Sequence, residues 1–195
     1  MRVVSGSARG CKLTPVPGLT TRPTTDRVKE NVFNLIQNEV RDAEVLDLFA
    51  CTGQLGIEAL SRGAAHCDFV ERDGAAYNTV RKNTEAARVS ARAALHRTEA
   101  DAFVALAAKR RYGLIFLDPP YGGKILENAL LQIETFDILS TNGIIICESA
   151  VGDVFRHGFE TVRSRRYGAT LITVLRLRDG GTDETNENSD LSGQL

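Results

Sequence analysis

The sequence predicts a single α/β domain with a doubly wound, mostly parallel sheet that carries one antiparallel strand. Segments with strand character alternate with segments with helix character five times between residues 44 and 147. Residues 114–117 (Leu-Ile-Phe-Leu) form an unbroken apolar run, which is typical of a strand buried on both faces of a parallel sheet. Two further strand-like segments on either side of Gly168 predict an antiparallel pair that closes the sheet.

The overall composition is that of an ordinary globular protein. The chain has 195 residues, of which 43% are hydrophobic and 25% charged, so one domain can bury a core without disulfides or metals. It has no apolar run of about 18 residues, the length that a membrane-spanning helix needs. The first residues also lack the apolar centre of a signal peptide. We therefore expect a cytoplasmic protein that makes no membrane contact.

Cysteine and histidine residues predict no metal site. The four cysteines are widely scattered and form no C-x-x-C pair: Cys11, Cys51, Cys67 and Cys147. We expect four reduced and mostly buried thiols. The three histidines are equally isolated, and we expect each to pack in the core or face solvent: His66, His96 and His157.

The net charge of −1 conceals an uneven distribution along the chain. Residues 179–195 hold five acidic residues and no basic one, and without them 24 basic residues stand against 20 acidic ones, a net charge of +4. We expect residues 179–195 to be an acidic disordered tail, because they show no hydrophobic periodicity. Residues 1–178 are then one domain, in which residues 1–41 form a basic N-terminal hairpin and helix and residues 42–178 form the sheet.

The N-terminal part predicts a short β-hairpin followed by a helix. Strand-like residues 3–4 and 11–13 flank a turn between Gly6 and Gly10. After a loop rich in proline and glycine, Thr24 or Thr25 can cap a helix in which apolar residues recur at helical spacing from Val28 to Val40. Residues 1–41 contain seven basic and three acidic residues, which allows a surface that meets a polyanion or simply a solvated face.

The remaining elements follow in regular order. Helices are predicted at residues 57–62, 75–88, 102–108 and 125–133, and a turn at Asn142 and Gly143. The predicted strands span residues 44–49, 67–70, 93–96, 114–117, 144–147, 159–167 and 169–177.

One motif, Asp118-Pro119-Pro120-Tyr121, stands at the end of the most apolar strand. The prolines cannot continue a central strand, so the chain leaves the sheet at the edge where open α/β sheets hold their ligands. The Asp118 carboxylate and the Pro119 carbonyl can accept the two hydrogens of an exocyclic amino group, while the Tyr121 ring stacks on the base. The alternative is a strand that ends at prolines, with a tyrosine on the surface.

Three more carboxylates follow successive predicted strands, namely Asp47, Glu71 and Asp101. Glu71 comes 24 residues after Asp47, close to the roughly 20-residue spacing at which an acid binds ribose hydroxyls in dinucleotide folds. The loop between Cys51 and Gly56 lacks the G-x-G-x-x-G pattern, and an acid beneath it disfavours phosphate. This pattern favours a ligand with a ribose and a cationic amine, such as S-adenosylmethionine, over a structural turn with incidental acids.

Residues 1–178 resemble the RsmD-like family of bacterial guanine-N2 methyltransferases that act on small-subunit (16S) ribosomal RNA. The matching stretches are residues 22–30, 45–50, 55–64, 69–73 and 118–121. The resemblance implies a Rossmann-like, S-adenosylmethionine-dependent methyltransferase with a seven-stranded sheet. It also implies that Glu71 binds the ribose, that Asp101 binds the adenine amino group and that the loop from Asp47 to Gly56 surrounds the methionine end.

These observations define the residues expected at the site. The catalytic set is Asp118, Pro119 and Tyr121, and Asp118 also contacts the cofactor. The rest of the cofactor set is Asp47, Phe49, Cys51, Gly53, Gly56, Glu71, Arg72, Asp101 and Ala102. RNA is expected to meet Arg9, Lys12, Arg22, Arg27 and Tyr121, with further phosphate contacts from Arg163, Arg165 and Arg166. The family usually has glycine where this chain has Cys51, and a side chain there restricts φ and crowds the cofactor.

The expected partner is ribosomal RNA or a partly assembled small subunit, and three alternatives remain open. A DNA or RNA adenine-N6 methyltransferase would share the chemistry, but the DNA enzyme would need a domain that recognises the DNA target, for which this chain has no space. A protein-glutamine methyltransferase typically has asparagine where Asp118 stands. An RNA-binding or assembly factor without catalysis is favoured only by Cys51.

Overall fold

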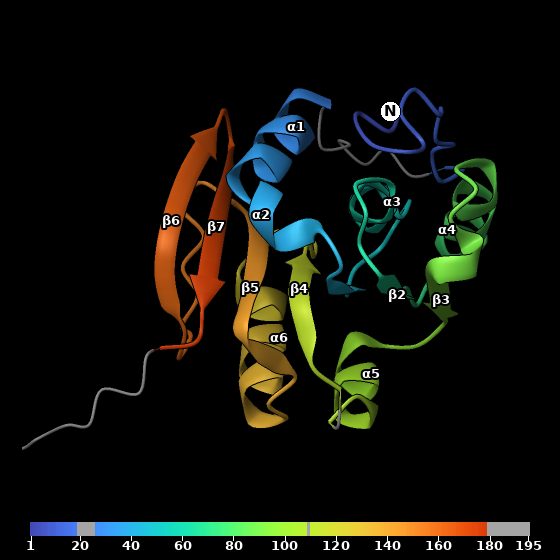
Figure 1. Cartoon of the computed structure of the whole chain (residues 1–195). Helices are drawn as coiled ribbons and strands as arrows, with labels where there is room; N and C mark the ends of the chain where they lie inside the picture. The colour runs from blue at the N-terminus through green and yellow to red at the C-terminus, as the bar shows by residue number, and fades with distance from the viewer. Residues whose placement is uncertain (19–25, 109, 179–195) are drawn as a thin grey trace, which may run out of the picture.

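The computed structural model of the protein describes residues 1–18, 26–108 and 110–178. Within this part of the chain, seven strands form one sheet in the order β3-β2-β1-β4-β5-β7-β6 (Figure 1). The strands are β1 (Glu44–Asp47), β2 (His66–Val70), β3 (Ala93–His96), β4 (Tyr112–Leu117), β5 (Leu139–Ala150), β6 (Glu160–Tyr167) and β7 (Thr170–Arg176). The helices are α1 (Asp26–Leu35), α2 (Gln37–Val40), α3 (Gln54–Ser61), α4 (Gly74–Ala86), α5 (Ala100–Leu106) and α6 (Lys124–Thr135), with a 3₁₀ turn at Ser90–Arg92.

The pairing of the strands confirms the predicted fold. The four strand pairs among β1 to β5 are parallel, whereas β7 runs antiparallel to both β5 and β6. The sheet is therefore doubly wound and mostly parallel, with β7 as its antiparallel strand. Figure 1 shows β6 and β7 standing beyond β5 at one edge.

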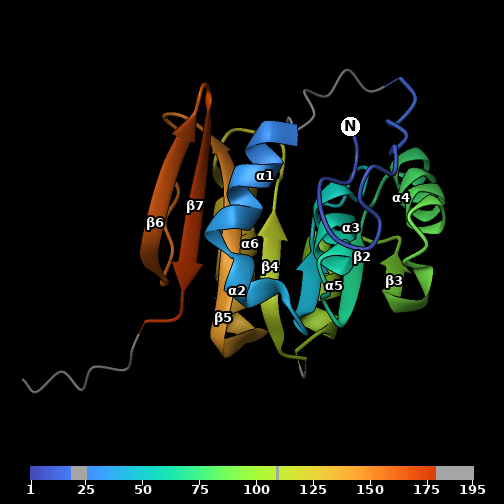
Figure 2. The same ribbon diagram turned by 45° about the horizontal axis from the view of Figure 1, so that its top comes forward.

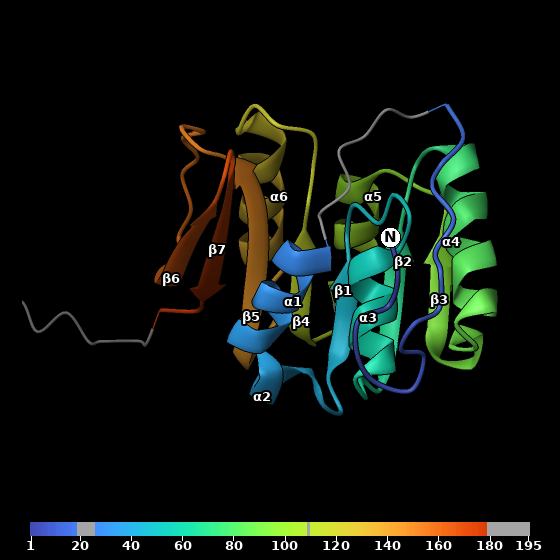
Figure 3. The same ribbon diagram turned by 90° about the horizontal axis from the view of Figure 1, so that it is seen from above.

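Helices cover both faces of the sheet. Helices α1 to α4 lie on one face, and α5 and α6 on the other (Figure 3). In β4, Leu114 and Phe116 belong to the first core, while Ile115 and Leu117 belong to the second. This arrangement explains the unbroken apolar run at residues 114–117, because a strand covered on both faces buries every side chain.

The turn predicted at Asn142 and Gly143 is wrong, because β5 continues through both residues. Tyr112 pairs with Leu139, but Leu114 pairs with Ile144, so β5 has more residues than β4 between these two pairs. The register of the two strands shifts at this point, as at a β-bulge. A Cβ atom on Gly143 would lie 2.9 Å from the Tyr112 carbonyl oxygen. The glycine therefore permits a close backbone approach within a strand rather than a reversal of the chain.

Several helix boundaries also differ from the predictions. The single helix expected across residues 28–40 is divided into α1 and α2 at Ile36, whose φ of −121° is not helical. Helix α3 begins at Gln54 instead of residue 57, directly after Gly53 at a φ of 75°. Helix α5 begins at Ala100, so Asp101 lies in its first turn. The proposed caps Thr24 and Thr25, the tail at residues 179–195 and Arg22 lie outside the described residues.

The N-terminal segment (residues 1–14) reverses direction as predicted, but it forms one isolated bridge, between Arg2 and Lys12, rather than two strands. The Val3 N–H donates to the Cys11 carbonyl at 2.9 Å. The turn packs against the end of α3, where the Ser7 N–H donates to the Ser61 carbonyl and a Cβ on Gly6 would come within 1.8 Å of the same oxygen. Figure 2 shows this segment lying beside α3 and α4.

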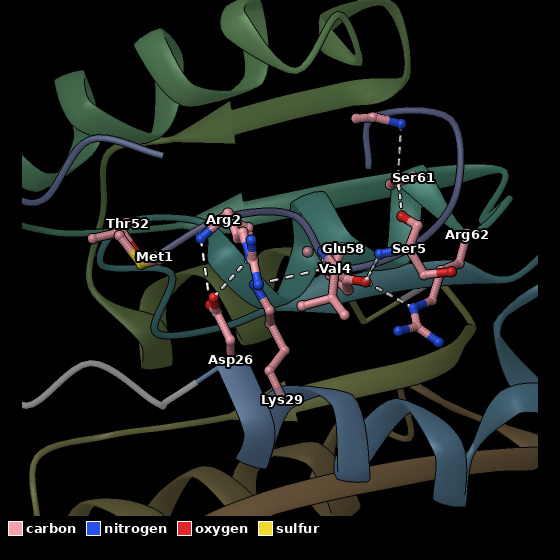
Figure 4. Close-up of polar contacts among 12 residues, drawn as sticks. Met1, Arg2, Val4, Ser5, Asp26, Lys29, Thr52, Glu58, Ser61 and Arg62 are labelled. Atoms are coloured by element: carbon pink, nitrogen blue, oxygen red, sulfur yellow. Dashed lines mark hydrogen bonds and ion pairs between the residues drawn. The ribbon is translucent and has the colours of Figure 1, made fainter. Parts of the chain in front are cut away.

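A buried ion pair joins the N-terminal segment to two helices (Figure 4). The Glu58 carboxylate of α3 accepts hydrogen bonds from the Val4 and Ser5 amides at 2.8 and 2.9 Å, and it lies 3.5 Å from the Lys29 ammonium of α1. Lys29 also donates to the Arg2 carbonyl. Burial lowers the pKa of Lys29, and the Glu58 charge opposes that shift. These contacts fix the start of the chain on the domain surface.

The expectation that every histidine packs in the core or faces solvent is incomplete for His96. Its Nε2 lies 2.6 Å from the buried Asp68 carboxylate, which also accepts hydrogen bonds from the Tyr112 hydroxyl and the Arg110 guanidinium. Burial acts to raise the pKa of Asp68, but these hydrogen bonds outweigh it and lower that pKa. The four cysteines are free thiols, as expected, although Cys11 and Cys51 are only partly buried. In the described residues, no helix is long and apolar enough to cross a membrane, and no group of three or more His, Cys, Asp or Glu residues could hold a metal ion.

Candidate active site

A cavity of about 920 Å³ opens at the carboxyl ends of the parallel strands. Its size is within the range of sites for small molecules and cofactors. The walls include seven residues of the predicted cofactor set: Asp47, Phe49, Cys51, Glu71, Arg72, Asp101 and Asp118. The predicted catalytic residues Asp118, Pro119 and Tyr121 line the same cavity. The sheet thus brings together the acids that the sequence places at the ends of successive strands.

Asp47 lies at the bottom of the loop that joins β1 to α3. The residue is 2% exposed, and its Oδ2 accepts a hydrogen bond from the Gly56 amide at 3.0 Å. This contact satisfies one of the free N–H groups in the first turn of α3. Burial raises the pKa of Asp47 to about 7, and the nearby Glu71 charge adds to the rise while the Gly56 amide opposes it.

Glu71 links two loops at the rim of the cavity. One of its carboxylate oxygens accepts the Cys51 amide at 2.9 Å, and the other accepts the Asp73 amide at 2.8 Å. Each oxygen of an ionised carboxylate can accept a second hydrogen bond, so these contacts orient the group without saturating it. Glu71 can therefore hold the loop and still accept a pair of hydroxyl groups from a ligand.

Asp118 contributes a third acid to the same wall, and it is partly buried. Burial raises its pKa well above the usual value for a carboxyl group, and the charges of Glu148 and Asp47 raise it further. Acids crowded into a low-dielectric cavity favour a ligand that brings positive charge, because a cation stabilises their ionised forms. Gln54 supplies further evidence for a polar ligand, since its Oε1 is buried at the cavity wall without a hydrogen-bond partner.

Cys51 adopts a left-handed backbone conformation, with a φ of 51°. This geometry favours glycine, which is the residue expected at this position from the family resemblance. The thiol lines the cavity, and burial together with the charges of Glu71, Asp118 and Asp47 raises its pKa to about 11. The protonated thiol is therefore a small neutral group on the cavity wall, not a nucleophile.

Three residues predicted to bind the cofactor do not line the cavity: Gly53, Gly56 and Ala102. Gly53 directly precedes α3 and has a φ of 75°, and a Cβ on Gly56 would lie 2.3 Å from the Phe69 ring. These glycines therefore shape the turn and allow α3 to pack closely on β2. Ala102 is exposed on α5, one residue beyond Asp101, whose Oδ2 accepts a hydrogen bond from Asn128 of α6 at 2.8 Å.

Tyr121 stands at the mouth of the cavity, and its side chain is 54% exposed. Its hydroxyl donates to Glu148 Oε1 at 3.4 Å and lies 3.3 Å from the Thr170 hydroxyl. Glu148 is absent from the predicted site. A sequence signal for it exists, because Glu148 follows the buried run of residues 144–147 just as Asp118 follows that of residues 114–117.

The described residues expected to meet RNA come from four parts of the structure: the N-terminal segment, α1, the mouth of the cavity with Tyr121, and β6. Arg9 and Lys12 are exposed in the N-terminal segment, and Arg27 is exposed on α1. The three arginines of β6 are all exposed on the edge strand of the sheet: Arg163, Arg165 and Arg166. The structure therefore keeps every described member of this set available to a partner.

Comparison with known proteins supports the resemblance seen in the motifs. The family model described as "Conserved hypothetical protein 95" matches residues 1–176. A Bacillus subtilis protein named "Putative rRNA methyltransferase YlbH" is 41% identical over 188 residues, which covers 91% of this chain and 100% of that protein. The Escherichia coli "Ribosomal RNA small subunit methyltransferase D" is 38% identical over 154 residues, which covers 77% of this chain and 75% of that protein.

A solved structure agrees with the sequence comparisons. The structure described as "Putative methyltransferase yhhF from Escherichia coli" matches this fold with a TM-score of 0.80 at 32% sequence identity, covering 91% of this chain and 98% of that chain. The family match covers residues 1–176, so the similarity in sequence runs from the N-terminal segment to the end of β7. The chain therefore belongs to the conserved hypothetical protein 95 family, the RsmD-like family that its motifs predicted.

Proposed function

We propose that this protein transfers a methyl group from S-adenosylmethionine to the exocyclic N2 amino group of a guanine in small-subunit ribosomal RNA. The observation that carries the proposal is the placement of Asp118, Pro119 and Tyr121 on one cavity with the buried Asp47. A relative that covers 77% of this chain is named as a small-subunit ribosomal RNA methyltransferase, which supports the RNA substrate.

The cavity fits S-adenosylmethionine, which supplies an electrophilic methyl group on a positively charged sulfur. Glu71 would accept hydrogen bonds from its ribose hydroxyls, and Asp101 would bind its adenine amino group. Asp47 and the loop that follows would surround the methionine end, where positive charge stabilises a buried carboxylate. The unpaired Gln54 Oε1 offers one more acceptor at this wall.

A guanine amino group needs help from the protein because its lone pair is delocalised into the ring. The Asp118 carboxylate and the Pro119 carbonyl would accept its two hydrogens and so favour a pyramidal nitrogen. They would also stabilise the positive charge that develops on this nitrogen during methyl transfer. One N–H proton then leaves the product, and the Asp118 carboxylate is placed to take it.

Ionisation of Asp118 couples this chemistry to the cofactor. Its raised pKa means that the carboxyl group of the free protein holds its proton to a higher pH than usual. A cationic cofactor in the same cavity would lower that pKa and convert Asp118 to the acceptor that the reaction needs.

The target base must leave its helix or loop to reach this cavity, because the amino group cannot meet Asp118 while the base is stacked and paired. The exposed Tyr121 ring would stack on the extruded base, an interaction worth about 1–3 kcal/mol. Arg9, Lys12 and Arg27, together with the arginines of β6, would contact phosphates and hold the RNA without reading its sequence.

The test is methyl transfer from labelled S-adenosylmethionine to undermethylated small-subunit RNA, both as naked RNA and as partly assembled particles. The labelled nucleoside is then identified after digestion. N2-methylguanosine is the expected product. A different methylated nucleoside would reject the substrate assignment, and binding of the cofactor without any transfer would favour an RNA-binding factor that lacks catalysis.

A further inference from the structure

Glu148 lies on β5 at the level of Asp118, the residue that directly follows the neighbouring strand β4. Leu117 pairs with Cys147 in the parallel ladder, and Asp118 and Glu148 each follow their strand's paired residue by one position. Both carboxylates line the cavity, and Glu148 is a buried residue, 8% exposed. Two neighbouring strands therefore present an acid to the same ligand space.

Glu148 also contacts the other side of the predicted base pocket. Its Oε1 accepts a hydrogen bond from the hydroxyl of Tyr121, whose ring is the expected stacking surface. After burial, the Glu148 charge is the largest influence that raises the pKa of Asp118. Glu148 is therefore close to both the group that would bind the amino hydrogens and the ring that would hold the base.

The bases differ in what flanks their exocyclic amino groups. In guanine, the N2 amino group lies between the ring N1–H, which is a hydrogen-bond donor, and the ring N3, which is an acceptor. In adenine, the ring nitrogens on either side of the N6 amino group are acceptors, and in cytosine the N4 amino group has an acceptor on one side and a C–H on the other. An ionised carboxylate is an acceptor only, so it complements guanine and repels the other two bases.

We propose that Glu148 accepts the N1–H of the target guanine and thereby selects guanine over bases that have no ring N–H beside the amino group. The inference rests on the proposed function and adds to it a residue that determines specificity. Asp118 and Pro119 then act on the amino group, Tyr121 holds the ring, and Glu148 reads the neighbouring edge.

The analogue that probes this contact is 2-aminopurine, which keeps the 2-amino group but has an acceptor at N1 instead of a donor. It also lacks the 6-oxo group of guanine, and because that loss is common to every variant, the comparison between variants isolates the contact at N1. A site built to bind a substrate N–H rejects an analogue that lacks it, because a buried polar group is left facing another acceptor. We expect wild-type kcat/KM to fall at least about 100-fold when 2-aminopurine replaces the target guanine. The amide of a Glu148→Gln variant can either donate or accept, so its ratio of guanine to 2-aminopurine rates is expected to fall below about 10.

The experiment first locates the guanine that the wild-type enzyme methylates, by mass spectrometry of RNA fragments. RNA with guanine or 2-aminopurine at that position is then prepared by ligation of synthetic segments and assayed with wild type, Glu148→Gln and Tyr121→Phe. The Tyr121→Phe variant removes the hydroxyl that donates to Glu148 but retains the ring and the carboxylate. A Glu160→Gln variant, on the exposed strand β6, controls for loss of one negative charge.

A lower ratio in Glu148→Gln, with wild-type ratios in Tyr121→Phe and Glu160→Gln, supports the inference. An unchanged ratio in Glu148→Gln overturns it while leaving the proposed function intact. Equal loss of discrimination in Glu148→Gln and Tyr121→Phe also overturns it, because Glu148 would then act only by positioning Tyr121. If the wild-type product is not N2-methylguanosine, the proposed function fails first and this inference fails with it.

Discussion

Replacing Asp47 with asparagine should stabilise the protein at high pH but not at low pH. The side chain of Asp47 is almost fully buried, and its pKa is raised from 3.8 to about 7. The folded state binds this proton more tightly than the unfolded state. The contribution of Asp47 to the free energy of unfolding is therefore fully present below about pH 4 and is lost as pH rises to about 7. At about 1.4 kcal/mol per pKa unit, the loss amounts to about 4 kcal/mol.

Asp47→Asn removes the charge but keeps an oxygen that can accept the Gly56 amide. Free energies of unfolding, from urea titrations of both proteins between pH 4 and 8.5, measure the effect. The free energy of unfolding of the variant, relative to that of wild type, should rise by up to about 4 kcal/mol between about pH 4 and 8.5. An Asp42→Asn control changes an exposed carboxylate and should show no such trend.

The same variant should bind S-adenosylmethionine more weakly, because the ionised Asp47 stabilises the positive charge of the ligand. Wild-type affinity should therefore increase as pH rises through about 7, with release of a proton on binding, and this dependence should be weaker in Asp47→Asn. Isothermal titration in buffers of different ionisation enthalpy measures both quantities. The reasoning is refuted if the free energy of unfolding of Asp47→Asn, measured relative to wild type, is no higher at pH 8.5 than at pH 4.

Three further predictions address the rest of the site. Glu71→Gln should bind S-adenosylmethionine about 10–150-fold more weakly in isothermal titration, as for loss of a hydrogen bond to a charged group, and unchanged affinity would remove Glu71 from the site. Cys51→Gly should relieve a left-handed conformation that costs about 1–2 kcal/mol, and this gain in folding stability is partly offset by the greater freedom of glycine in the unfolded chain. The affinity of this variant for the cofactor should be equal or higher, and weaker binding would contradict the crowding argument. Replacing Arg9 and Lys12 with alanine should flatten the salt dependence of RNA binding by about 0.7–0.9 in log–log slope for each lost contact, whereas an identical slope would make this segment a solvated face.

The sequence predicts the acids of the cavity because parallel strands end at one edge of the sheet, so residues that follow successive strands must gather there. Asp47, Glu71 and Asp118 are found by this rule without knowledge of the strand order. Glu148 directly follows the predicted strand at residues 144–147, so the same rule could have found it. Its partner Tyr121 is 27 residues away, so nothing local connects the two.

Contacts between distant residues also explain the other differences. The break at Ile36 interrupts a helical pattern that looks continuous in the sequence. Gly143 looks like a turn residue because a sequence cannot show that the Tyr112 backbone approaches it from a neighbouring strand. The pairing of Lys29 with Glu58 joins residues from two separate helices, and both ions look like surface residues until the N-terminal segment covers them.

The central claim is that Asp118 acts on the transition state of methyl transfer. Single-turnover methylation of the target RNA by Asp118→Ala, at saturating cofactor and RNA, tests this claim most directly. The loss of one preorganised electrostatic partner predicts a rate about 10²–10³-fold below wild type, with Asp118→Asn between the two and with the affinities for both ligands changed far less. An Asp118→Ala enzyme that methylates RNA at the wild-type single-turnover rate would contradict the account.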